Sequence, residues 1–174
     1  MSKSKEKKPH VSLKIAIMTV SDTRDESTDT SGQLLVERVA SANHIVADKK
    51  IVRDEPELIR RAVGGWLGQV DVIVSTGGTG LTLRDVTADV FEALYEKRIP
   101  GFGELFRQLS YADIGTSTIQ SRASGGIARG TLLFALPGSP GAVRLAWDEI
   151  LVYQLDVNQR PCNLVEILGR IREE

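Results

Sequence analysis

Short apolar segments of strand length alternate with amphipathic segments of helical period along most of this chain, and this alternation restricts the fold more than any other feature. Four segments are expected to be strands: Leu13–Val20, Ile45–Val52, Asp71–Ser75 and Thr131–Leu136. Helices are expected over about residues 30–42, 55–67, 88–97, 103–109 and 142–155. Because strand–helix–strand units close with right-handed crossovers, the pattern predicts a Rossmann-like α/β fold in three α/β/α layers, with a mainly parallel central sheet.

The length suits one domain, which we expect over residues 11–174 of the 174, because domains most often contain about 100–200 residues. Residues 1–10 form a Lys-rich tail that we expect to be disordered. Four lysines and one glutamate give this tail a charge of +3, which leaves −4 for the rest of a chain of net charge −1. A mildly acidic body argues against nucleic acid as a partner, because a nucleic-acid surface is normally strongly basic.

Apolar segments are also too short for a membrane protein. No apolar run approaches the ~20 residues needed to cross a bilayer, and residues 1–8 lack the apolar core of a secretory signal. The one cysteine, Cys162, cannot form an internal disulfide. These features predict a reduced, cytoplasmic setting and no membrane partner.

Three polar loops follow the expected parallel strands, over residues 21–29, 76–85 and 137–141, and all are rich in Gly, Ser, Thr or Asp. Ligands of open α/β sheets bind beyond the carboxyl ends of the strands. The sequence therefore predicts the binding site at the edge of the sheet where these three loops lie.

The most informative loop is Thr76-Gly77-Gly78-Thr79-Gly80. Glycines let the backbone approach a ligand closely, so that successive N–H groups can bind an anion such as phosphate. The loop is not a Walker A motif, because no Gly-Lys-Ser/Thr follows, and not a dinucleotide fingerprint, because Leu83 stands where a third glycine is needed. From the glycines alone, a phosphate-binding loop and a tight turn are equally favoured.

Two aspartates favour the phosphate interpretation. Asp85 follows the glycine loop, where its charge would repel phosphate unless a divalent cation such as Mg²⁺ bridges the two. The alternative is that Asp85 only complements the positive end of a following helix, which Thr87 is expected to cap. For Asp54, the local pattern with Pro56 and Glu57 favours a helix N-cap, a role that leaves one carboxylate oxygen free for a metal.

Other polar residues carry a weaker signal. Ser21 and Asp22 offer groups suited to ribose, base edges or metal-bound water, although an ordinary surface loop is the favoured alternative, and Ser121 could line a polar pocket. Arg84 and Arg122 are kept only as candidate helpers. Two isolated histidines provide neither a Ser/His/Asp triad nor a histidine metal site.

Taken together, these motifs resemble the molybdopterin-binding family, which includes the bacterial MoaB and MogA proteins and the G domain of gephyrin. The resemblance covers roughly residues 11–163 and rests on TGGTG at 76–80 followed by RDVT at 84–87. Further matching segments occur in the right order: VSDT at 20–23, DTSG at 29–32, PGFGE at 100–104, SR at 121–122 and LPGSP at 136–140. The segments GELFR at 103–107, DIGTS at 113–117 and RPCN at 160–163 look like the MoaB branch, and the longer C-terminal extension of the MogA branch is absent.

The resemblance implies a molybdopterin adenylyltransferase of molybdenum cofactor biosynthesis, with ATP and molybdopterin as substrates and Mg²⁺ as cofactor. It implies a homotrimer or homohexamer, and a downstream molybdenum-insertion protein as a further partner. Asp54 and Asp85 match the family's catalytic and metal-binding aspartates. The residues that match or neighbour its binding segments are Ser21, Asp22, Thr76, Gly77, Gly78, Thr79, Gly80, Ser121, Pro137, Gly138 and Ser139. A catalytically silent molybdopterin-binding or scaffold protein, and an unrelated nucleotide-binding regulator, remain as alternatives.

Overall fold

The computed structural model describes residues 7–173, which contain a six-stranded sheet in the order β2-β1-β3-β6-β5-β4. The strands are β1 (Lys14–Val20), β2 (Ile45–Val52), β3 (Val72–Thr76), β4 (Lys97–Arg98), β5 (Ser124–Ala128) and β6 (Thr131–Leu136). β1 pairs in parallel with β2 and β3, β3 pairs in parallel with β6, and β5 is antiparallel to both β6 and β4. The prediction of a mainly parallel sheet is confirmed, and the polar strand β2 lies at an edge.

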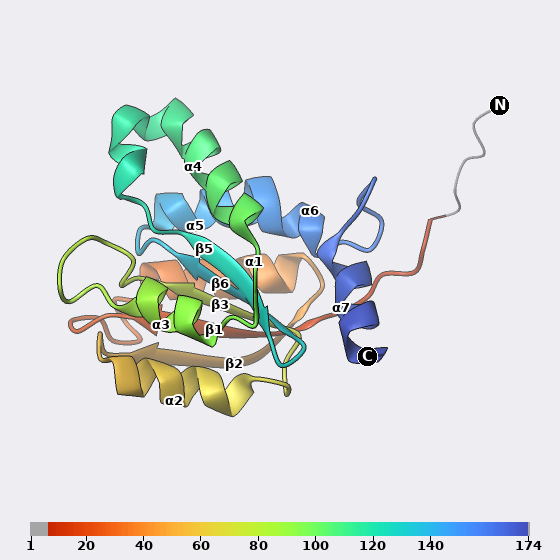
Figure 1. Ribbon diagram of the computed structural model, residues 1–174, viewed down its shortest axis with the longest axis horizontal. Helices are drawn as coiled ribbons and strands as arrows, with labels where there is room; N and C mark the ends of the chain where they lie inside the picture. Colours follow the sequence, from red (N-terminus) through yellow and green to blue (C-terminus); the bar gives the residue numbers. More distant parts are fainter. Residues whose placement is uncertain (1–6, 174) are drawn as a thin grey trace.

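Helices cover both faces of this sheet, as Figure 1 shows. They are α1 (Thr30–Ser41), α2 (Pro56–Trp66), α3 (Thr87–Leu94), α4 (Pro100–Ile114), the 3-10 helix η1 (Gly115–Gln120), α5 (Pro140–Ala146), the π-helix η2 (Trp147–Leu151), α6 (Val152–Gln154) and α7 (Leu164–Glu173). Residues from α1, α4, α5 and α7 pack on one face and residues from α2 and α3 on the other. The predicted three layers are therefore present.

The two cores follow from the alternation of side chains along the strands. In β1, Ile15 and Ile17 join the core beneath α1 and α5, whereas Ala16 and Met18 join the core beneath α2 and α3. All four side chains are fully buried. A strand that is apolar on both faces is stable only between two helical layers, which is why β1 lies inside the sheet.

The helix expected over residues 103–109 is much longer than predicted. Pro100, which lies between the two helices expected over 88–97 and 103–109, occupies the first turn of α4, where proline's missing N–H costs no hydrogen bond. Phe102 and Phe106 lie on the buried face of the helix, one turn apart. The helix ends where Gly115 adopts a φ of 57°, and η1 then returns the chain toward the sheet.

Strand β5 was not predicted from the sequence. Its centre is Gly125-Gly126, and glycine normally weakens a strand. Here the missing side chains let large rings pack against the backbone, since a Cβ on Gly126 would lie 2.3 Å from the Tyr95 ring and one on Gly125 would lie 3.0 Å from the Phe134 ring. Tertiary packing therefore overrides the local preference.

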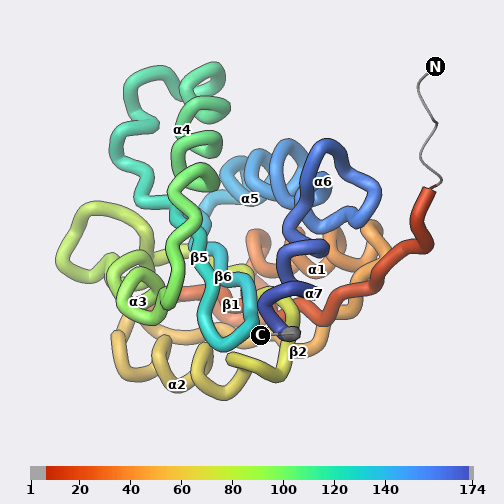
Figure 2. The backbone as a smooth tube through the Cα atoms, turned by 45° about the vertical axis from the view of Figure 1, so that its right-hand side comes forward, coloured from red at the N-terminus to blue at the C-terminus, as the bar shows by residue number. Residues whose placement is uncertain are grey.

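Helix α7 was also missed, although Asn163 caps it by accepting a hydrogen bond from Glu166 N at 2.9 Å. The described N-terminal segment runs beside α7, as Figure 2 shows, and Lys8 Nζ lies 2.6 Å from Glu166 Oε1. Residues 1–6 of the expected disordered tail lie outside the described residues. Within residues 7–173, no helix is long and apolar enough to cross a membrane.

Candidate functional site

The loops after β1, β3 and β6 lie at the same edge of the sheet, because these strands are parallel neighbours. Two of the loops are joined directly: Gly77 N donates to Leu136 O at 3.0 Å and Thr76 Oγ1 donates to Pro137 O at 3.0 Å. Ser31 Oγ in α1 donates to Gly138 O at 3.0 Å. The glycine loop and the loop after β6 therefore form one connected surface.

Glycine is required by geometry where the loop leaves β3. Gly77 has a φ of 100°, and a Cβ on it would lie 2.2 Å from Val20 O. No other residue fits at this position, since both the backbone conformation and the contact exclude a side chain. The turn brings the backbone of the glycine loop against the end of β1.

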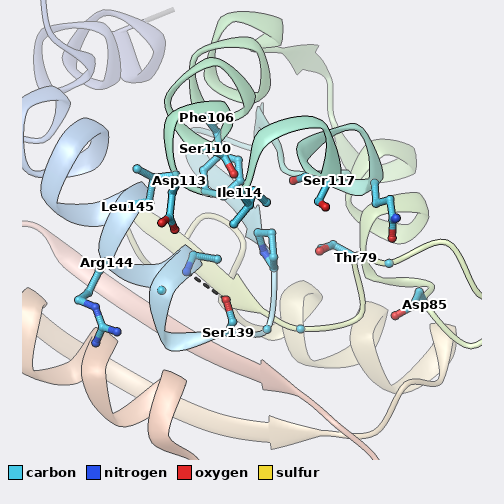
Figure 3. Close-up of a pocket in the computed structure, with 18 of the residues that line it drawn as sticks. Thr79, Asp85, Phe106, Ser110, Asp113, Ile114, Ser117, Ser139, Arg144 and Leu145 are labelled. Atoms are coloured by element: carbon cyan, nitrogen blue, oxygen red, sulfur yellow. Dashed lines mark hydrogen bonds between the residues drawn. The ribbon is translucent and has the colours of Figure 1, made fainter.

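A cavity of about 750 Å³ opens in front of the glycine loop. Its walls come from the two joined loops, the second half of α4, η1 and α5, as Figure 3 shows. Predicted site residues that line it are Gly77, Gly78, Thr79, Gly80, Asp85, Ser121, Pro137, Gly138 and Ser139. Thr76 is buried at the end of β3 behind this surface.

Ser21 and Asp22 line a different hollow, of about 610 Å³, which also contains Lys49 and Arg53. The structure therefore does not bring them into the main cavity. Asp22 is still linked to the glycine-loop segment, because its carboxylate forms an ion pair with Arg84. The hydrogen bond from Arg84 lowers the pKa of Asp22 and outweighs desolvation, which acts in the opposite direction.

Asp85 lies in the cavity wall and is held firmly. Its Oδ2 accepts hydrogen bonds from Thr82 Oγ1 at 2.6 Å and from Thr82 N at 3.0 Å. The Thr82 hydroxyl is the main reason why the pKa of Asp85 is lowered, so the carboxylate is ionised at neutral pH. Arg122 holds the glycine loop, because its Nε donates a hydrogen bond to Gly80 O at 2.8 Å. Its Nη1 forms an ion pair with Asp89 of α3.

Asp54 does not cap α2, so the capping interpretation is wrong. The residue at the N-cap is Glu55, which is extended (φ −125°, ψ 122°) and makes no side-chain capping bond. Pro56 explains this shift, because the residue before a proline avoids the helical conformation. Asp54 is half-buried, and among residues 7–173 no group donates a hydrogen bond to its carboxylate. Burial first, and then the negative charges of Asp22 and Asp85, raise its pKa.

The expectation that Thr87 caps α3 is also wrong. Thr87 is the first residue of α3, and Val86 occupies the N-cap without a side-chain bond. The Thr87 backbone N–H instead donates to Gly78 O at 2.9 Å. This bond ties the start of α3 to the glycine loop.

Asp54 and Asp85 flank the glycine loop from two sides. A Cβ on Gly78 would lie 2.6 Å from Asp54 Oδ1, and one on Gly80 would lie 2.7 Å from Asp85 Oδ2. Within the described residues no group of three or more His, Cys, Asp or Glu side chains is close enough to hold a metal by itself. Two carboxylates beside the glycine loop are a donor set that fits Mg²⁺, because Mg²⁺ uses one or two carboxylates and completes its shell with water and substrate phosphates.

Charged cavity residues that the sequence did not single out are Asp113 on α4 and Arg144 on α5. Figure 3 places both at the end of the cavity away from Asp85, with Ser110 and Ser117 between. Arg144 could have been predicted as a site residue, because it lies one turn into the helix that follows the loop after β6. Asp113 begins the DIGTS segment of the family resemblance, but it was given no role at the site because the full length of α4 was not predicted.

The chain matches the family model described as "Probable molybdopterin binding domain" over residues 16–157. It is 47% identical over 155 residues to Molybdenum cofactor biosynthesis protein B of Escherichia coli (strain K12), covering 88% of this chain and 91% of that protein. A crystal structure of Molybdenum cofactor biosynthesis protein B has a TM-score of 0.85 and 41% identity, covering 96% of this chain and all of that one. The tungsten cofactor synthesizing protein MoaB from Pyrococcus furiosus has a TM-score of 0.74 and 32% identity, covering 93% and 96%.

Proposed function

Because this chain belongs to the molybdopterin-binding domain family, whose matching relatives are molybdenum cofactor biosynthesis proteins, we propose that it adenylylates molybdopterin. Its role in molybdenum cofactor biosynthesis follows from the relatives that it matches over nearly their whole length. The proposed reaction transfers the adenylyl group of ATP to the terminal phosphate of molybdopterin. The observation that carries this proposal is the cavity in front of the glycine loop, with Asp85 in its wall and with Asp54 outside the cavity lining but next to Gly78 of the loop.

In this reaction a phosphate oxygen of molybdopterin attacks the α-phosphorus of ATP. The bond from that phosphorus to the bridging oxygen breaks, and pyrophosphate leaves. The attacking oxygen is already anionic at neutral pH, so no protein base has to remove a proton. This agrees with a cavity whose lining contains no histidine.

The main difficulty is the repulsion between two anionic substrates. The charged residues that line the cavity are Asp85, Asp113 and Arg144, so the wall itself carries one more negative than positive group. Bound Mg²⁺ would neutralise charge on the triphosphate while Asp54 and Asp85 hold it. The N–H of Gly77 is already bonded to Leu136 O, whereas the N–H groups of Gly78 and Thr79 donate to no group among residues 7–173 and would be available to phosphate oxygens. Positioning of this kind would lower the entropic cost of the reaction.

The serine-containing wall suits the second substrate. Ser121 and Ser139 offer hydroxyls in the lining of the cavity, and Arg144 supplies a positive charge at the end away from Asp85. We assign the glycine-loop end of the cavity to ATP phosphates and this wall to the pterin. Asp22 would then act only through its ion pair with Arg84 beside the loop, and Ser21, whose hydroxyl accepts hydrogen bonds from Thr23 N and Arg24 N, would have no contact with either substrate in the main cavity.

The direct test is incubation with molybdopterin, ATP and Mg²⁺, with mass-spectrometric detection of adenylyl-molybdopterin and a coupled measurement of pyrophosphate. We expect both products in equal amounts, and neither in excess chelator. Equal product in chelator would refute the metal role. Binding of molybdopterin without any product would favour a silent binding or scaffold protein.

Assembly as a homotrimer or homohexamer is part of the proposal. In support, Tyr111 and Ile119 at the outer end of α4 and η1 expose 60% and 79% of their surface, which is a high exposure for large apolar side chains. Sedimentation should give three or six copies per particle, and an active monomer at micromolar concentration would refute this. A molybdenum-insertion protein as the next partner and a cytoplasmic location stay predictions.

A further inference from the structure

Thr87 carries a buried hydroxyl group that the fold itself does not use. The side chain is completely buried, and Oγ1 has no hydrogen-bond partner among residues 7–173. Other buried threonines in the same sheet region are satisfied: Thr19 donates to Asp29, Thr76 to Pro137 O and Thr131 to Val70 O. An unpaired buried hydroxyl is destabilising, so its presence calls for a role outside folding.

The hydroxyl lies beside the carboxylate that the proposed function assigns to the metal. The position that a Gly78 Cβ would occupy is 2.2 Å from Thr87 Oγ1 and 2.6 Å from Asp54 Oδ1. The two oxygens thus converge on one point from different elements, α3 and the segment before α2. This approach is possible only because Gly78 has no side chain. Its φ of 66° also favours glycine over any other residue at this position.

A donor without an acceptor therefore lies next to an acceptor without a donor. Asp54 receives no hydrogen bond within the described residues, and the backbone bond from Thr87 N to Gly78 O fixes Thr87 in place. Both oxygens lie within 2.6 Å of the position of a Gly78 Cβ, so the Thr87 hydroxyl is the nearby donor toward which the Asp54 carboxylate could turn. Carboxylates that bind metals usually accept such a bond from a neighbouring group, which sets their orientation.

We propose that Thr87 is a positioning residue whose hydroxyl donates a hydrogen bond to Asp54 Oδ1 when Mg²⁺ and a nucleoside triphosphate bind. The bond would orient the other carboxylate oxygen, Oδ2, toward the cation. This inference rests on the proposed function through the metal role of Asp54. It adds a group that the metal-binding pattern of two aspartates does not include.

The experiment measures how much Mg²⁺ strengthens the binding of α,β-methylene-ATP, an analogue that cannot transfer its adenylyl group. Calorimetric affinities are compared in Mg²⁺ and in excess chelator for wild type, Thr87→Val and Thr87→Ser. We expect the gain from Mg²⁺ to fall about 10-fold or more in Thr87→Val and to remain in Thr87→Ser, because losing such a supporting bond typically costs 10–100-fold in metal affinity. Affinity in chelator should stay the same in all three, since the glycine loop is unchanged.

Thr131→Val is the matched control, because Thr131 is equally buried but its hydroxyl is bonded to Val70 O and to Gly68 N. The melting temperature of Thr131→Val should fall, while Mg²⁺ should strengthen its analogue binding as much as in the wild type. Thr87→Val should keep its melting temperature and lose most of the increase in affinity that Mg²⁺ gives. If Thr87→Val does not fold, Thr87→Ala takes its place with the same readouts.

Three outcomes would overturn the inference. A normal Mg²⁺ gain in Thr87→Val would refute it and leave the proposed function intact. If the gain is lost as fully in Thr87→Ser, which keeps the hydroxyl, as in Thr87→Val, then the hydroxyl bond does not account for the gain and the inference is refuted. No gain in the wild type would refute both the inference and the metal role on which it rests.

Discussion

The two aspartates beside the glycine loop are held in opposite ways. Asp85 is fixed by the Thr82 backbone and hydroxyl, and these bonds lower its pKa. Asp54 accepts no hydrogen bond within the described residues, and burial together with two nearby carboxylates raises its pKa. The contrast indicates that the Asp85 side of the site is organised by the protein's own hydrogen bonds, whereas the Asp54 carboxylate is not held by any donor among residues 7–173.

The largest expected effect comes from Asp54→Asn. If Asp54 binds Mg²⁺, the loss of its charge should lower turnover by roughly 10- to 100-fold or more, because Mg²⁺ prefers carboxylate oxygens. Since Asp54 caps no helix, Asp54→Ala should have the same melting temperature as Asp54→Asn. Steady-state kinetics and thermal unfolding measure the two effects.

Glu55→Gln is the matched control for that experiment, since Glu55 is the adjacent acid and makes no side-chain capping bond. It should keep normal turnover. Normal turnover in Asp54→Asn, or an equal loss of turnover in Glu55→Gln, would contradict the metal role of Asp54 and with it the proposed contrast between Asp54 and Asp85.

The second-largest effect is expected when a side chain is added at Gly78, between Asp54 and Thr87. Gly78→Ala places a Cβ 2.2 Å from Thr87 Oγ1 on a backbone with a φ of 66°, so we expect a stability loss of about 1–3 kcal/mol. Affinity for ATP should weaken as well, because the loop must move. Gly101→Ala, at a helical position where a Cβ meets nothing within 4 Å, should not destabilise the protein. Denaturant unfolding that shows equal stability for both variants would contradict the close approach.

A smaller effect is expected on the organised side. Thr82→Val removes the hydroxyl bond to Asp85, which should raise the pKa of Asp85 toward its ordinary value and cost about 0.5–1.5 kcal/mol. A lowered carboxyl pKa stabilises the folded state above the unfolded pKa, and this stabilisation is lost as pH falls through the folded pKa. Wild type and variant should therefore converge in stability as the medium becomes acidic. An unchanged pKa in an NMR titration of the Asp85 carboxyl carbon would contradict the assignment.

The smallest effect has the opposite sign and concerns Asp54. A carboxyl with a raised folded pKa lowers stability as pH rises from the unfolded pKa, near 3.8, through the folded pKa, because the folded state keeps the proton longer. In chelator, Asp54→Asn should match the wild type in strong acid and be slightly more stable above this window. Melting temperatures across the pH range test this, and an Asp54→Asn variant that is less stable at neutral pH would show that the carboxylate has a structural role.

The parts of the molecule that could be predicted from the sequence are those where local pattern and tertiary structure agree. Buried runs such as Ile15–Met18 read correctly as parallel strands, and this placed the three loops at one edge of the sheet. β5 was missed because Gly125 and Gly126 disfavour a strand locally. Their role is to let the rings of Phe134 and Tyr95 pack against the backbone, and these contacts cannot be seen in the neighbouring sequence. The cap assigned to Asp54 was wrong because Pro56 moved the start of the helix by one residue.

The same distinction applies to the candidate site. Backbone-driven features, the glycine loop above all, were visible as sequence motifs. Features that depend on two distant segments were not: the Asp22–Arg84 ion pair spans 62 residues and the unpaired Thr87 hydroxyl becomes apparent only beside Asp54. Asp113 and Arg144 reach the cavity only because α4 and α5 face each other across it.

The pairing of the N-terminal segment with α7 has a practical consequence for tagging, immobilising or fusing this protein. Lys8 bonds to Asn158 and Glu166, and Arg172 pairs with Asp71 just before β3, so both ends of the described chain lie at the amino ends of the parallel strands. The cavity lies at their carboxyl ends, one strand length away. An affinity tag, a surface tether or a fused enzyme at either end would therefore leave the mouth of the cavity open. A short peptide joining the two ends would allow the chain to be reopened elsewhere without crossing the site.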